Sequence, residues 1–177
     1  MVYLSNGVSV QKDVWLREQR EVFYLYNFKS AASDIFRFDP ANKVLKKVTC
    51  EKQLPEVLSQ ARKSPNMIDR YDAYLALRNI PLADKREVLV WGFQNETFYG
   101  LRNEIIKQLM ESEEMYDLVQ SKLLKENPET IKFFIGNFNE IPQGFLYFYE
   151  SWLSHPSYDI VTSVLQKLYD NYPEKIT

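Results

Sequence analysis

The amino-acid sequence predicts a mainly α-helical protein made of stacked helical hairpins, with a short β segment in front of them. From about residue 51 onward, apolar residues recur at positions i, i+3, i+4 and i+7, the spacing of one helix face. Proline or a small polar residue separates these stretches at short intervals, as in consecutive αα-hairpins. Only 5 of the 177 residues are glycine while 15% are aromatic, which suits a helical core better than a β fold with many turns. The expected architecture is a HEAT/armadillo-like α-α superhelix.

Residues 1–50 are predicted to form the β segment, as the end of a β-sandwich-like domain. Residues 8–10 alternate apolar and polar side chains, and residues 22–26 are aromatic and β-branched, as strands prefer. Residues 35–38 form another short extended run, which Asp39-Pro40 ends because proline disfavours helix in the preceding residue. About three strands are too few for an independent sheet with two covered faces. The segment is therefore expected to be the tail of a larger β domain, or a lid on the helices.

Residues 51–177 are predicted to form the HEAT-like helical domain, with about eight helices. Proline or a potential capping residue marks the junctions between the helices. These junctions are expected at Lys63–Asn66, Pro81, Thr97, Asn127-Pro128, Pro142 and Pro156. Asn66 and Thr97 are the expected N-caps of the helices that follow them, and Pro156 is the expected first residue of the last helix.

An internal repeat supports the stacked arrangement. A shift of 32 residues aligns Arg70 with Arg102 and Asp72 with Glu104. Self-similarity at this period is typical of a helical solenoid, and the alternative is chance similarity between amphipathic helices. The four residues are predicted to form ion pairs within or between neighbouring hairpins. The alternative for the two arginines is recognition of a substrate carboxylate across a cleft.

The charge balance and the apolar runs exclude two classes of partner. With 22 basic and 24 acidic residues the formal net charge is −2, which leaves little to neutralise phosphates, so no nucleic-acid binding is expected. No apolar run reaches the roughly 18–20 residues of a membrane span. Neither end of the sequence distinguishes a cytoplasmic protein from a periplasmic or secreted one.

The sequence also lacks a recognisable catalytic constellation. A zinc peptidase site of the HExxH type needs two histidines on one helix, whereas His155 is the only histidine. We expect His155 to be a loop residue near a helix start. Cys50 is the only cysteine, so no intramolecular disulfide can form, and we expect it to be a half-buried small apolar residue. As it stands, the chain is expected to hold no cofactor and to catalyse no reaction.

Several local motifs resemble the C-terminal region of M1-family zinc aminopeptidases, most of all the bacterial, cold-active type. They are a strand ending in Asp39-Pro40 with a leucine-lysine step at 45–46, the helix at 54–61, the stretch 69–77 and the stretch 98–102. The landmarks lie within residues 8–110, and none of them is a catalytic motif.

This resemblance implies a non-catalytic domain that walls the active-site chamber of a metallo-aminopeptidase and limits access to short peptides. The partner would be the catalytic domain of the same parent hydrolase, which would hold the zinc ion and bind the peptide substrates. The family's zinc ligands, its GxMEN loop and its catalytic tyrosine have no counterpart in this chain. The resemblance therefore implies a piece of a longer protein. The alternative is a HEAT-like scaffold domain that binds another protein.

An aromatic stretch at 145–152 has two possible roles. Large apolar side chains cover more than one face of the helix predicted there. Phe145, Tyr149 and Trp152 are expected either to belong to the buried core or to form a docking surface for the missing catalytic domain, since large exposed apolar patches usually mark contacts.

Overall fold

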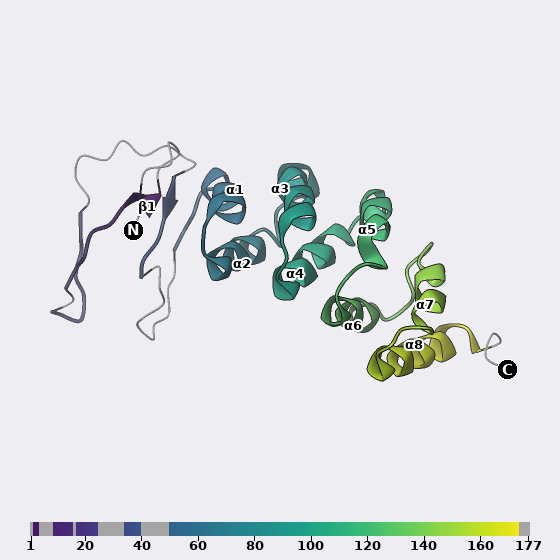
Figure 1. The fold of residues 1–177 in the computed structure, drawn as a ribbon. Coiled ribbons are helices and arrows are strands. Elements are labelled where there is room, and N and C mark those ends of the chain that lie inside the picture. Colours follow the sequence, from purple (N-terminus) through teal and green to yellow (C-terminus); the bar gives the residue numbers. More distant parts are fainter. Residues whose placement is uncertain (1, 4–8, 16, 25–33, 40–49, 174–177) are drawn as a thin grey trace. The chain divides into compact units, whose positions relative to one another are not determined.

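The computed structural model describes residues 2–3, 9–15, 17–24, 34–39 and 50–173 (Figure 1). Within these residues three short strands precede eight α-helices, so the predicted fold class, mainly α with a short N-terminal β segment, is confirmed. The chain divides into two compact units, Met1–Asn79 and Ile80–Thr177. The change from strand to helix, where the sequence suggested a domain boundary at residue 50, lies inside the first unit.

The strands of the first unit form a small antiparallel sheet. β1 (Val2–Tyr3) lies between β2 (Ser9–Val10) and β3 (Ile35–Phe36), with Val2 opposite both Val10 and Phe36. β3 and the strand near Val10 agree with the sequence prediction, whereas β1 carries no sequence signal that predicted it.

Residues 22–24, the described part of the strand predicted at residues 22–26, do not form a strand. Val22, Phe23 and Tyr24 have no strand pairing and their side chains are exposed, while residues 25 and 26 lie outside the described residues. β-favouring residues form a strand only where a partner edge is available to them. The prediction for residues 22–24 is therefore wrong.

A helical hairpin completes the first unit. α1 (Leu54–Lys63) begins with a proline in its first turn, and α2 (Met67–Ala76) packs against it. The side chain of Asn66 accepts a hydrogen bond from the Ile68 N–H at 3.0 Å, which confirms the predicted N-cap. α1 also contacts β3, so that the sheet and the hairpin are joined.

The second unit is a succession of helices in two layers. In Figure 1, α4, α6 and α8 follow one another along one side of this unit, and α3, α5 and α7 along the other. Accordingly α4 contacts α6 and α6 contacts α8, while α3 packs on α4 and α7 on α8. The elements are α3 (Leu82–Asn95), α4 (Tyr99–Leu109), the 3₁₀ turn η1 (Glu113–Met115), α5 (Tyr116–Leu123), α6 (Pro128–Asn137), α7 (Leu146–Trp152) and α8 (Tyr158–Asn171). Contacts mainly between successive hairpins are the defining property of a helical solenoid.

The helix starts follow the capping signals in part. Asn127 accepts a hydrogen bond from the Thr130 N–H at 2.9 Å and α6 begins at Pro128, as predicted. Thr97 is not the N-cap of α4, because the helix begins at Tyr99 with Phe98 in the cap position. The ring of Phe98 lies over Gly100, where a Cβ atom would come within 2.7 Å of it. Aromatic packing rather than a hydroxyl cap thus accompanies this helix start.

The start of α8 is likewise shifted from its predicted position. The helix begins at Tyr158 with Ser157 in the cap position, so Pro156 precedes the helix and is not its first residue. At the other end of α8, the side-chain oxygen of Asn171 accepts a hydrogen bond from the Ile141 N–H at 2.9 Å, which joins the end of α8 to the loop between α6 and α7. No helix in the described residues is both long and apolar enough to cross a membrane.

Candidate functional site

The two aligned arginines make the same contact in their two hairpins. Arg70 Nη1 donates to the carbonyl oxygen of Ser64, the C-cap residue of α1, at 3.0 Å. Arg102 Nη1 donates to the carbonyl oxygen of Glu96, the C-cap residue of α3, at 2.8 Å. Both arginines lie six residues beyond the cap residue. The repeat of 32 residues therefore corresponds to a repeated contact, which we call the arginine clasp.

The clasp has a simple electrostatic origin. The last carbonyl groups of a helix have no intrahelical partner and carry the negative end of the helix dipole, so a guanidinium group bonded there is stabilising. Arg102 also donates to Phe93 O at 3.0 Å, and its guanidinium carbon lies 5.1 Å from the centre of the Phe93 ring. Arg102 is buried, so these contacts occur out of bulk water.

The ion pair of Arg102 joins two hairpins, and its partner is one that the sequence pattern did not indicate. Arg102 Nε donates to Glu126 at 2.7 Å, and Nη2 binds the other oxygen of the same carboxylate. Glu126 follows α5, so the pair ties α4 to the next hairpin. Glu104, which was the expected acidic residue, instead accepts a hydrogen bond from Gln108 at 2.9 Å.

A row of buried polar side chains, joined by hydrogen bonds, links α3 to α4. Lys85 Nζ donates to Gln108 Oε1 at 3.0 Å, and the Gln108 amide in turn reaches Glu104. Lys85 also lies 3.6 Å from the exposed carboxylate of Glu111. These contacts give the buried ammonium group of Lys85 neutral and anionic acceptors, which a buried charge requires. They hold two helices of one hairpin together.

A second polar cluster, which we call the strap junction, joins β3 to the first hairpin. Arg37 and Asp69 form a buried ion pair, with 8% and 2% of their side chains exposed. Asp69 also accepts a hydrogen bond from Ser64 Oγ at 3.1 Å. The Phe36 N–H donates to Glu56 at 3.0 Å, so both β3 and the residue after it are bonded to helices of the hairpin.

The remaining member of the predicted ion-pair set, Asp72, belongs to the surroundings of this junction. Burial raises the pKa of Asp72 above its ordinary value, and the nearby charges of Arg37 and Lys52 oppose that rise. Lys52 Nζ also donates to Phe36 O at 3.1 Å. Asp72 thus faces cations of the junction, which act on its titration.

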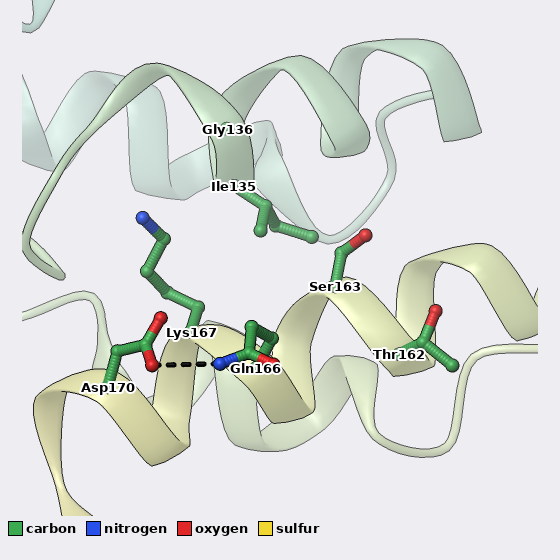
Figure 2. A pocket seen from close by; sticks show the side chains of 7 residues that line it. All are labelled: Ile135, Gly136, Thr162, Ser163, Gln166, Lys167 and Asp170. Carbon is green, nitrogen blue, oxygen red and sulfur yellow. Dashed lines mark hydrogen bonds between the residues drawn. The ribbon is translucent and has the colours of Figure 1, made fainter.

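An open groove of about 430 Å³ lies between α6 and α8 (Figure 2). Hydroxyl, amide and charged side chains from α8 face Ile135 and Gly136 of α6 across it. The groove is lined by Ile135, Gly136, Thr162, Ser163, Gln166, Lys167 and Asp170. A Cβ atom added at Gly136 would meet no atom within 4 Å, so the groove is open at this position.

The α8 wall of the groove is held in place by hydrogen bonds. Lys167 Nζ donates to Phe138 O at 2.7 Å and Asn139 O at 3.3 Å, beyond the end of α6. Gln166 donates to Asp170 at 2.8 Å, the dashed line in Figure 2. These groups can exchange hydrogen bonds with a ligand backbone. No group of three or more metal-ligating side chains occurs within the described residues.

The three aromatic residues proposed for docking lie in the core of the second unit. The centre of the Phe134 ring is 5.3 Å from Phe145, 6.4 Å from Tyr149 and 6.1 Å from Trp152. All three are buried, because the short α7 packs its aromatic side against its neighbours. The docking-surface prediction for these residues is therefore wrong, and the buried-core alternative holds.

Apolar exposure is found at other places, which the sequence did not single out. In the β segment the side chains of Trp15, Val22 and Tyr24 are largely exposed. On α8 the side chains of Tyr158, Leu165 and Tyr169 are 79%, 43% and 60% exposed. The available signal was the breadth of the apolar pattern in α8, which covers more of the helix than one buried face needs.

The lone histidine and the lone cysteine have ordinary roles. His155 Nδ1 accepts a hydrogen bond from the Ser157 N–H at 3.0 Å, so the histidine stabilises the turn before α8, as expected of a loop residue. Cys50 is exposed and not half-buried, because it lies in irregular chain ahead of α1.

Comparisons of this chain with protein-family models, with curated proteins and with solved structures find no match. The resemblance to the M1 aminopeptidases therefore rests on the local motifs alone.

Proposed function

We propose that this chain is a non-catalytic helical-hairpin module that binds another protein through the groove between α6 and α8. The groove is the observation that carries the proposal. It combines an open floor at Gly136 with a row of hydrogen-bonding side chains on α8. Side chains on the helical layers of stacked hairpins commonly serve as extended binding surfaces.

The chemistry of the groove favours a peptide segment as the bound part of the partner. Thr162, Ser163 and Gln166 offer neutral donors and acceptors, and Asp170 offers one carboxylate. Such a lining matches the alternating N–H and C=O groups of an extended backbone. Lys167 uses its ammonium group to bind carbonyl oxygens of this chain, which keeps the wall rigid before a partner arrives.

A groove-filling substitution tests this proposal without disturbing the fold. In Gly136→Leu the new Cβ atom meets no other atom, and leucine favours helix over glycine by roughly 0.5–1 kcal/mol. We expect a photoreactive amino acid at position 163, which lines the groove, to cross-link one defined protein in cells of the source organism. The same label at the exposed Asp84 of α3 is the control.

The cross-link from position 163 should disappear in Gly136→Leu while the helical signal and the unfolding midpoint are kept. An undiminished cross-link in Gly136→Leu, or equal labelling from positions 163 and 84, would rule out the groove as the binding surface.

A more specific candidate for the partner is the catalytic domain of an M1-family aminopeptidase on the same parent chain. The motif resemblance at 36–40, 69–77 and 98–102 supports this candidate. The exposed Trp15, Val22 and Tyr24 of the β segment also suit contact with the rest of a β domain. In that setting the module would border the zinc site and restrict entry to short peptides, while the zinc chemistry would belong to the other domain.

The gene provides the test of this candidate. A reading frame that continues upstream and encodes HExxH followed 18 residues later by glutamate is the expected result. The encoded catalytic domain, produced separately, should then bind this chain in a 1:1 complex by calorimetry. A reading frame without the zinc motif would leave the scaffold function and exclude the aminopeptidase.

A further inference from the structure

The last helix carries an exposed apolar face, which we call the α8 stripe. It consists of Tyr158, Val161, Leu165 and Tyr169. Their spacing of three, four and four residues places them on one side of a helix with 3.6 residues per turn. Tyr158 and Tyr169 are among the most exposed large apolar residues of the second unit, Leu165 is also exposed, and Val161 is partly exposed.

A different side of α8 faces α6. Asp159 of α8 forms an ion pair with Lys132 of α6 at 3.3 Å. Ser163 and Asp170 line the groove shared with α6. At about 100° per residue, these positions lie roughly 80–160° around the helix from Leu165 and Tyr169. The stripe and the groove therefore occupy different sides of α8.

Within the described residues, no helix covers the α8 stripe. Each earlier helix of the layer of α4, α6 and α8 is covered by the next one, since α6 covers α4 and α8 covers α6. An exposed apolar face of this kind usually marks a contact with another surface. The α8 stripe runs along one helix, and such a surface suits packing against another helix.

We propose that a second copy of this chain covers the α8 stripe, through antiparallel pairing of the two α8 helices about a two-fold axis. The stripe is self-complementary under this operation. A two-fold axis beside residues 163 and 164 places Tyr158 opposite Tyr169 of the other copy. Val161 of each copy then lies close to Leu165 of the other copy at the centre. A two-fold interface requires such a patch, which matches itself when reversed.

The charges around the stripe are compatible with two identical copies. The positions on its rim, Thr162 and Gln166, are neutral. The acidic groups Asp159 and Asp170 lie on the side of α6, where Lys132 and Gln166 respectively bind them. Two stripes can therefore approach without bringing like charges together, which would otherwise oppose self-association.

The size of the stripe sets the strength of the pairing. The exposed parts of its large side chains amount to roughly 400 Å² per copy, taking about 150–250 Å² for each aromatic residue. Two copies would then bury roughly 800 Å², below the approximately 1,200 Å² of a standard stable interface. An interface of this size makes the dimer weak and reversible.

Sedimentation equilibrium of the chain between about 10 µM and about 1 mM tests the pairing, because a weak dimer forms only toward the upper concentration. The weight-average mass should rise from 21.0 kDa toward about twice this value. Leu165→Glu should stay monomeric, because it places two carboxylates in the centre of the apolar interface. Ser163→Glu is the matched control, since position 163 is exposed on the side of α6, and it should associate like the parent.

The direction of the pairing is tested with cysteines in a Cys50→Ser background, because Cys50 is exposed and would react as well. A mixture of Tyr158→Cys and Tyr169→Cys chains should form mixed disulfides in preference to disulfides between identical chains. A chain that stays monomeric at 1 mM would overturn the proposal. Association that Leu165→Glu leaves unchanged, or disulfides mainly between identical chains, would overturn it as well.

Discussion

At the scale of single residues, the arginine clasps place a cation on the free carbonyl groups at the end of a helix. Arg102 makes the larger set of contacts, because it also forms the buried ion pair with Glu126. Breaking a buried ion pair leaves an uncompensated charge, which is costly, whereas an exposed pair contributes little. In the second unit, Arg102 belongs to a buried ion pair and Arg86 belongs to an exposed one.

We expect Arg102→Met to lower the free energy of unfolding by about 3–5 kcal/mol, because Glu126 and two carbonyl groups lose their partner. The matched control is Arg86→Met. Arg86 lies 3.7 Å from Glu114, with about half of each side chain exposed, and its loss should cost less than about 1 kcal/mol. Urea unfolding followed by circular dichroism measures both. Equal losses in the two variants would contradict this account of the clasp.

Tyr149 makes the free energy of unfolding depend on pH in alkaline solution. Burial raises the pKa of its phenol well above the ordinary value of 10.0. Above pH 10 the unfolded chain loses the phenolic proton while the folded chain keeps it, so the free energy of unfolding falls as pH rises.

We expect Tyr149→Phe to reduce this loss by up to about 1.4 kcal/mol per pH unit above pH 10. Urea unfolding between pH 9 and pH 11 measures the slope. Tyr158→Phe, at an exposed position, should leave the slope unchanged. A parent-like slope in Tyr149→Phe would show that this residue does not set the dependence.

At the scale of secondary-structure elements, the strap junction fixes β3 to the first hairpin. Loss of Asp69 would leave Arg37 buried without its carboxylate, so β3 should separate from the hairpin more often. We expect Asp69→Ala to raise the hydrogen-exchange rate of the Phe36 amide, which is bonded to Glu56, by at least about tenfold. Asp159→Ala, which removes an exposed pair on α8, is the control and should leave that rate unchanged.

The elements could be predicted from the sequence where their signal is local. Asn66 caps α2 as predicted, and Asn127, at a predicted junction, caps α6, because a capping side chain bonds to the backbone two or three residues further on. The prediction of Thr97 as the N-cap of α4 fails because the ring of Phe98 packs at the start of the helix instead. Residues 22–24 fail because their pairing depends on a strand elsewhere in the chain.

The candidate site could be predicted much less well. The 32-residue repeat identified both arginines, yet the partner of Arg102 lies 24 residues away in the next hairpin, outside any helical period. The groove depends on how closely α6 and α8 approach each other, which sequence spacing does not encode. The sequence left both a core and a surface role open for Phe145 and Trp152, and the position of α7 decides for the core.

At the scale of the whole molecule, the stacking of the second unit separates its possible binding surfaces. The groove lies on the side of α8 that faces α6, and the α8 stripe lies on a different side of the same helix. Filling the groove at Gly136 should leave self-association intact, and Leu165→Glu should leave groove binding intact. The two surfaces can therefore be disabled one at a time.

The bonds at the end of α8 have a further consequence for how this unit moves. Lys167 and Asn171 hold backbone groups of Phe138, Asn139 and Ile141 in the connection that leads from α6 toward α7. Unwinding the last two turns of α8 would release that connection at the same time, so the two should open as one cooperative step. A ligand that binds α8 and keeps it helical would thereby also restrict the motion of the connection between α6 and α7, some thirty residues earlier in the chain, without contacting it.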